Sequence, residues 1–80
     1  MDKYEFMIAE FYDGLQIIPS EWYNTDKKLS IWPSHLKTKY RINKAIMEKE
    51  MPREKSDWEE LPVKRIFGGA SKKEFYVYKL

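Results

Sequence analysis

The residue types that carry catalysis and metal binding are scarce in this chain of 80 residues. It has one histidine, His35, directly after Ser34, and no cysteine. A serine nucleophile needs a base within reach and a third group to orient that base, whereas adjacent side chains on a helix point apart. A single histidine also falls short of the ligand set of a structural zinc site. We therefore predict a non-enzymatic protein without catalytic, cofactor-binding or metal-binding residues and without a small-molecule substrate.

Two groups of side chains remain that could bind a macromolecule. The first is aromatic, because Tyr and Trp dominate the energetics of protein interfaces; its candidate partner-binding residues are Trp22, Trp32, Trp58, Tyr76 and Tyr78. The second is basic, because lysine and arginine on one helix face can contact phosphates; its candidates are Lys37, Arg41 and Lys44. Against the first interpretation, tryptophans are also what a small domain needs to fill its core. Against the second, the chain is only mildly basic, with a pI near 8.8.

Charge is unevenly distributed along the chain. Residues 1–26 hold one lysine against six acidic residues, whereas residues 37–55 hold seven basic residues against three glutamates. An acidic first third and a basic middle are typical either of two faces with different partners or of ordinary solvated surfaces. The first residues carry acids and no apolar run, so we expect neither a secretory signal nor a membrane span. We accordingly expect an intracellular protein, nuclear or cytoplasmic.

A β-hairpin is predicted in the first quarter of the chain. Residues 4–12 are rich in aromatic and aliphatic side chains of both parities, as in a central strand with two partly buried faces. Asp13-Gly14 is a dipeptide that favours a two-residue hairpin turn. Residues 15–18 then form the returning strand, and Pro19, which cannot donate to a sheet, ends that strand or places it at an edge.

The middle of the chain predicts a third strand and then a helix. Residues 29–32 form the short strand, which Pro33 ends. Ser34 is a candidate helix N-cap, residues 35–50 contain neither Gly nor Pro, and Pro52 ends the helix. The expected apolar side of the helix comprises Leu36, Tyr40, Ile42, Asn43, Ile46 and Met47, with Lys39 reaching out to solvent from within it.

The last third predicts one strand securely and one element of open type. Residues 61–67 form a fourth strand with Pro62 at its start, and Gly68-Gly69 is expected to break it. Residues 75–80 have strong β character but also fit a short helix. The chain is thus expected to be a single small α+β domain over residues 1–80, with a curved antiparallel sheet or partial barrel of four to five strands and one amphipathic helix.

Several of these motifs together resemble a known group of proteins. They are Ile-Ile-Pro-Ser-x-Trp at residues 17–22, Trp-Pro at 32–33, Lys-Ala-Ile at 44–46, the lone Trp58 and Pro-Val-Lys-Arg-Ile-Phe-Gly at 62–68. The chain resembles the small N-terminal domain of uncharacterised insect and other invertebrate proteins, whose pattern is V-V-P-S-x-W, W-P-P, a basic amphipathic helix and W-x-x-x-P-V-x-x-L-G. This chain has Ser34 where W-P-P would place a second proline, and its tail is more aromatic. The resemblance implies a modular, non-enzymatic domain, often of a nuclear, transposon-associated or chromatin-associated protein.

These observations lead to two hypotheses of function. The first is a protein–protein interaction module, either an adaptor or self-associating, that belongs to a longer nuclear or chromatin-linked protein. The alternative is a nucleic-acid-binding domain that uses the basic face of the central helix. Prolines next to Trp22 and Trp32 are expected to direct these rings to the core, with at least one ring keeping an exposed face. A free sheet edge next to Pro19 would also allow a partner strand to add to the sheet.

Overall fold

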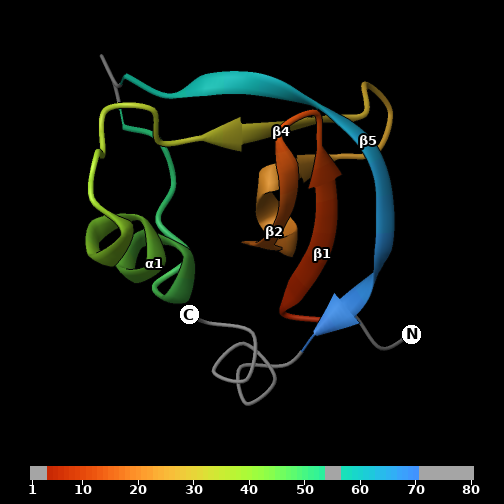
Figure 1. The fold of residues 1–80 in the computed structure, drawn as a ribbon, viewed down its shortest axis with the longest axis horizontal. Coiled ribbons are helices and arrows are strands. Elements are labelled where there is room, and N and C mark those ends of the chain that lie inside the picture. Colours follow the sequence, from red (N-terminus) through yellow and green to blue (C-terminus); the bar gives the residue numbers. More distant parts are fainter. Residues whose placement is uncertain (1–3, 54–56, 71–80) are drawn as a thin grey trace.

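The computed structural model describes residues 4–53 and 57–70 and shows one open, strongly curved antiparallel sheet with a single α-helix beside it (Figure 1). The strands lie in the order β2-β1-β5-β4-β3. The small α+β fold expected from the sequence is thereby confirmed, and the sheet does not close into a barrel. The elements are β1 (Phe6–Phe11), β2 (Gly14–Pro19), the 3-10 helix η1 (Ser20–Trp22), β3 (Tyr23–Asn24), β4 (Leu29–Trp32), α1 (Lys39–Met47) and β5 (Glu59–Ala70).

The predicted hairpin is present as β1 and β2, with its turn one residue earlier than expected. Phe11 pairs with Gly14, so the two loop residues are Tyr12 and Asp13, and Gly14 is the first residue of β2. Gly14 has a φ of +139°, a conformation that a side chain would strain. β1 lies between β2 and β5, which confirms a central strand, and β2 is an edge strand that ends at Pro19, also as predicted.

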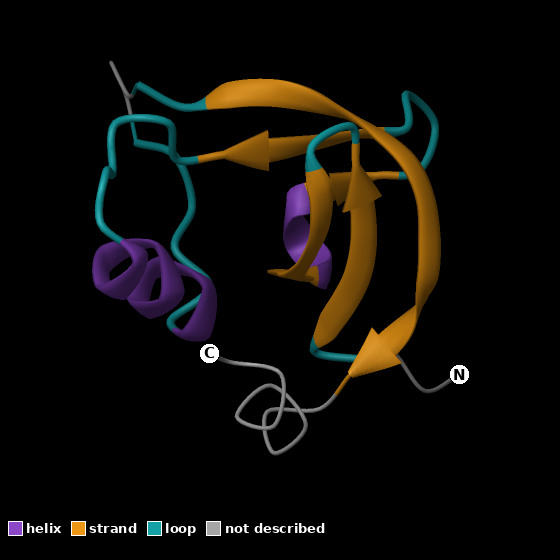
Figure 2. Ribbon diagram, viewed as in Figure 1, coloured by secondary structure: helices purple, strands orange, loops and turns teal. Residues whose placement is uncertain are grey.

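The longest strand, β5, wraps around the others, as Figure 2 shows. It pairs first with β4, through contacts such as Leu29 with Pro62, and then with β1 from Phe11 opposite Val63 onward. The register with β1 slips twice, where Lys64 and Phe67 have no residue opposite them. Such bulges bend a strand and increase its twist, which lets one strand belong to both halves of the curved sheet.

The prediction that Gly68-Gly69 would break the last strand is wrong, because β5 continues through both glycines to Ala70. Gly68 follows a bulge and has a φ of +148°, which only glycine adopts without strain. Gly69 lies directly under the Tyr4 side chain, which a Cβ at this position would overlap. The glycines therefore shape the strand instead of ending it.

The helix begins later than predicted, and Ser34 is not its N-cap. Residues 33–36 form a separate turn, in which the Leu36 amide donates to the Pro33 carbonyl at 3.0 Å. The N-cap is Thr38, whose hydroxyl oxygen accepts a hydrogen bond from the Arg41 amide at 3.2 Å. Threonine is a favoured N-cap because it satisfies an amide that has no partner within the helix.

The helix also ends earlier than predicted, at Met47 and not at Pro52. Lys49 adopts a φ of +53° and donates its amide to the Ile46 carbonyl, while the Glu50 amide donates to the Ala45 carbonyl. These two hydrogen bonds form the Schellman motif, which commonly has glycine at the left-handed position. Because lysine and not glycine occupies this position, the sequence alone does not indicate the end of the helix.

The buried side of α1 is narrower than predicted. Ala45 and Ile46 are buried against the sheet, and Ile42 and Met47 are half-buried. Tyr40 is 72% exposed, contrary to its assignment to the apolar side, because only a short part of α1 packs on the sheet, mainly on β2. Lys39 is exposed, in agreement with the expectation that it reaches solvent.

The core lies in the concave side of the sheet and under α1. Its buried side chains are Phe6, Ala9, Phe11, Ile17, Ile18, Trp22, Ala45, Ile46 and Val63. The buried Ser20 hydroxyl donates to the Tyr4 carbonyl at 2.6 Å and so ties η1 to the start of β1. This bond joins residues that are 16 positions apart in the sequence. The element predicted over residues 75–80, with Tyr76 and Tyr78, lies outside the described residues.

Candidate partner-binding pocket

The three tryptophans meet in one cluster with Trp22 at its centre. The Trp22 ring lies edge-to-face against Trp58, with centroids 5.1 Å apart, and against Trp32, at 6.1 Å. Its indole N–H donates to the Glu50 carbonyl at 2.7 Å, and its side chain is only 1% exposed. Trp22 is therefore a core residue that joins η1 to the end of the helix, and no surface of it is available to a partner.

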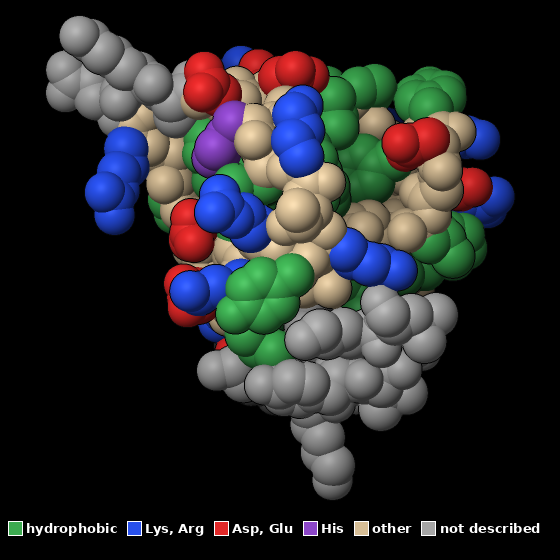
Figure 3. Space-filling view, turned by 60° about the vertical axis from the view of Figure 1, so that its left-hand side comes forward, with side chains coloured by type: hydrophobic (Ala, Val, Ile, Leu, Met, Phe, Trp, Pro, Cys, Tyr) green, Lys and Arg blue, Asp and Glu red, His purple; other side chains and the backbone are tan. Residues whose placement is uncertain are grey.

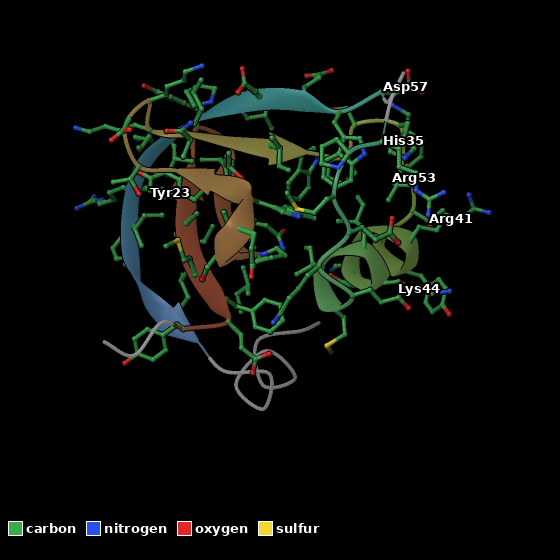
Figure 4. The ribbon with its side chains drawn as sticks, turned by 180° about the vertical axis from the view of Figure 1, so that it is seen from behind. Tyr23, His35, Arg41, Lys44, Arg53 and Asp57 are labelled. Carbon is green, nitrogen blue, oxygen red and sulfur yellow. The ribbon has the colours of Figure 1, made fainter. Side chains whose placement is uncertain are left out.

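Trp32 and Trp58 keep exposed faces, as expected of at least one ring. Both are half-buried against the core. Trp58 has the exposed His35 beside it, with ring centroids 6.2 Å apart, and Figure 4 shows the His35 side chain at the outer side of the molecule. On the other side of the cluster, Trp32 lies edge-to-face against Phe11 at 5.9 Å.

Trp32 and Phe11 line a surface pocket of about 190 Å³. One wall comes from the β1–β2 turn and the start of β2, and the opposite wall comes from β4 and β5, so the pocket lies between segments from both halves of the curved sheet. In Figure 3, hydrophobic side chains are exposed in the upper right part of the face. The lining residues are Phe11, Asp13, Gly14, Leu15, Gln16, Trp32 and Leu61.

The pocket adjoins an accessible sheet edge. β2 is the outermost strand, and its first residues, Gly14 and Leu15, are exposed, whereas Ile17 to Pro19 are buried. Leu15 is 63% exposed although it lines the pocket. The pattern of residue types alone could not find this pocket, because Leu15 and Leu61 look like ordinary strand residues and the pocket needs both halves of the sheet.

The predicted basic residues form a separate surface. Arg41 and Lys44 are exposed on α1, and Lys37 is exposed just before the helix, not within it as predicted. Figure 4 shows Arg53, which is not among the predicted basic residues, on the same side of the molecule as Arg41 and Lys44. Figure 3 shows lysine and arginine side chains mixed with acidic ones on the side that carries α1. In the described part of the chain, the ion pairs Lys49–Glu5 and Arg65–Glu10 involve none of these basic residues.

One carboxyl on the sheet has a shifted pKa. The Arg65 guanidinium donates a hydrogen bond to the Glu10 carboxylate at 2.8 Å, and this bond lowers the pKa of Glu10 below its usual value. Partial desolvation opposes the shift, while the positive charges of Arg65 and Lys64 reinforce it. The pair joins β1 to β5 and is structural in this arrangement.

No group of three or more metal-ligating side chains occurs among residues 4–53 and 57–70. Within the same ranges, α1 is too short and too polar to cross a bilayer. No family model matches the chain, and neither a curated protein nor a solved structure matches it. The resemblance to the invertebrate domain family therefore stays a prediction.

Proposed function

We propose that this domain is a non-enzymatic protein–protein interaction module that binds an extended peptide segment of a partner. The observation that carries the proposal is the pocket beside Trp32, which adjoins the exposed first half of the edge strand β2. A partner strand that pairs with Gly14 to Gln16 would gain main-chain hydrogen bonds, and one of its side chains would enter the pocket. This is the general logic of strand addition, in which the backbone supplies affinity and pockets supply specificity.

The apolar side chains around the pocket support this function. Leu15 is 63% exposed, Tyr12 at the tip of the hairpin is also exposed, and Trp32 offers part of its ring. Exposed apolar surface of this kind costs free energy in the isolated domain, which a partner would recover by covering it. A nuclear or chromatin-linked setting is part of the proposal through the resemblance alone.

A second candidate function is nucleic-acid binding by the basic side of α1. Lys37, Arg41 and Lys44 are exposed and form no ion pair with a described residue, and Tyr40 is exposed one helical turn before Lys44. Exposed aromatic rings beside phosphate-binding lysines suit single-stranded nucleic acids. This binding would weaken steeply as salt is added, whereas peptide binding at the pocket would change little.

The proposed function is tested by selecting binders from a random peptide library and measuring their affinity for two variants. Leu15→Thr removes an exposed apolar side chain from a residue that lines the pocket but keeps a good strand former, and we expect it to weaken binding at least tenfold. Met51→Thr removes a similarly exposed apolar side chain outside the pocket, and we expect it to bind as the unchanged domain does. Selected peptides that bind both variants equally would refute the pocket as the site.

A further inference from the structure

We propose that the pocket beside Trp32 selects a cationic side chain, lysine or arginine, from the partner segment. This inference rests on the proposed function, because it names the chemistry of the residue that enters the same pocket. Three features of the pocket support it: an aromatic wall, an acidic rim, and the absence of a basic residue among the described lining residues.

The aromatic wall provides a surface that attracts cations. Phe11 and Trp32 both line the pocket and lie edge-to-face, with an interplanar angle of 60°. The π-face of an aromatic ring carries negative potential, and tryptophan attracts lysine and arginine most strongly of the aromatic residues. The methylene stems of these side chains would meanwhile contact Leu61.

The rim of the pocket is acidic. Asp13 is one of the lining residues, is exposed, and forms no ion pair with a described residue. Glu59 pairs directly with Trp32 across β4 and β5, so its side chain lies on the same face of the sheet as Trp32. Leu61, two residues further along β5, shares that face and lines the pocket. A cation in the pocket would thus have Asp13 on one side and Glu59 towards the other.

Two basic residues of β5 have other partners. No lysine, arginine or histidine is among the described lining residues. Lys64 lies over the Tyr12 ring, 5.5 Å from its centroid, and Arg65 binds the Glu10 carboxylate. The acidic residues at the pocket are therefore not neutralised by a basic residue of the described part of the chain. Charge complementarity then favours a basic residue of the partner over an acidic or neutral one.

The experiment compares three blocked, strand-forming peptides that differ only at one central residue: lysine, norleucine or glutamate. Norleucine has the same methylene stem as lysine without the charge, so the comparison isolates the cation. We expect the lysine peptide to bind about tenfold more tightly than the norleucine peptide, which combines a cation–π contact with one exposed ion pair. The glutamate peptide should bind more weakly than both. Binding is measured by amide and indole NMR shifts up to millimolar peptide.

Two variants locate the effect. Asp13→Asn should reduce the preference for lysine over norleucine at least threefold, whereas Asp26→Asn, an equal charge change in the turn between β3 and β4, should leave the preference unchanged. If lysine and norleucine peptides shift the pocket signals with equal affinity, the cation inference is refuted while the proposed function stands. If none of the three peptides shifts any pocket signal, both are refuted.

Discussion

Trp22 is the largest fully buried side chain among the described residues, and replacing it with phenylalanine measures how strongly the packing depends on it. The change deletes the indole N–H that donates to the Glu50 carbonyl at 2.7 Å. It also reduces the contact area of two edge-to-face ring pairs and leaves a gap at a site that is 1% exposed. The carbonyl left without its donor costs about 1 kcal/mol or more. The gap and weakened ring contacts add about 2 kcal/mol, since phenylalanine retains a six-membered ring but lacks the fused five-membered ring of the indole.

We therefore expect Trp22→Phe to lower the free energy of unfolding by about 3 kcal/mol. A domain of this length has a total stability of roughly 4–12 kcal/mol, so the variant should remain folded in the cold but melt roughly 12–24 °C lower. The assay is urea unfolding followed by far-ultraviolet circular dichroism, with a thermal melt of the same samples. Unchanged urea dependence of the free energy would show that the loss is in the native state.

Trp58→Phe is the matched control. Trp58 is half-buried, contacts Trp22 through its ring, and donates no hydrogen bond from its indole to a described residue, so we expect a loss of about 1 kcal/mol. Equal losses at the two positions, or a loss below about 1 kcal/mol for Trp22→Phe, would refute the view that Trp22 joins η1 to the end of the helix.

Three further predictions test local features of the fold. Thr38→Ala should lower the free energy of unfolding by about 1 kcal/mol and Ser34→Ala by less than about 0.5 kcal/mol, because Thr38 is the cap; the reverse order in urea unfolding would restore Ser34 as the cap. Lys28 has a φ of +56°, so Lys28→Gly should raise the midpoint of thermal unfolding whereas Lys27→Gly should lower it, and a lower midpoint for both would contradict the assigned backbone conformation. Arg65 lowers the folded-state pKa of Glu10, so the Glu10–Arg65 pair stabilises the fold above the unfolded-state pKa of Glu10 and ceases to do so as pH falls through the lower folded-state pKa. The Glu10→Gln variant should therefore lose less stability than the unchanged domain between about pH 5 and pH 3. Parallel pH profiles of the two proteins would contradict the pairing.

The sequence predicted those elements whose signals are local. The apolar side chains of both parities in residues 4–12, the turn residues and Pro19 were enough to place the first hairpin and to make β2 an edge strand. The third strand agrees in its bounds, Leu29–Trp32, because Pro33 ends it. For Trp22 the sequence left both the core and a partner-binding surface open, and the structure places its ring in the core.

Features that depend on distant partners were missed. Nothing in residues 68–69 shows that β1 pairs with them, so glycines that permit a bulge and the close approach of Tyr4 looked like a strand end. The helix end relies on a lysine in a left-handed conformation, and β3 is too short to have a periodicity of its own. The pocket was missed for the same reason. Leu15 and Leu61 are far apart in the sequence and line one pocket only because β5 joins the two halves of the curved sheet.

The most direct test of the proposed function is an amide NMR titration of the labelled domain with a library-selected peptide, and separately with single-stranded DNA at low and high salt. We predict that the peptide shifts the signals of residues 13–16, the Trp32 indole and Leu61, and leaves Arg41 and Lys44 in place at either salt concentration. Shifts confined to Lys37, Arg41 and Lys44, produced by DNA and lost at high salt, would instead contradict the pocket account and make the helix face the binding site.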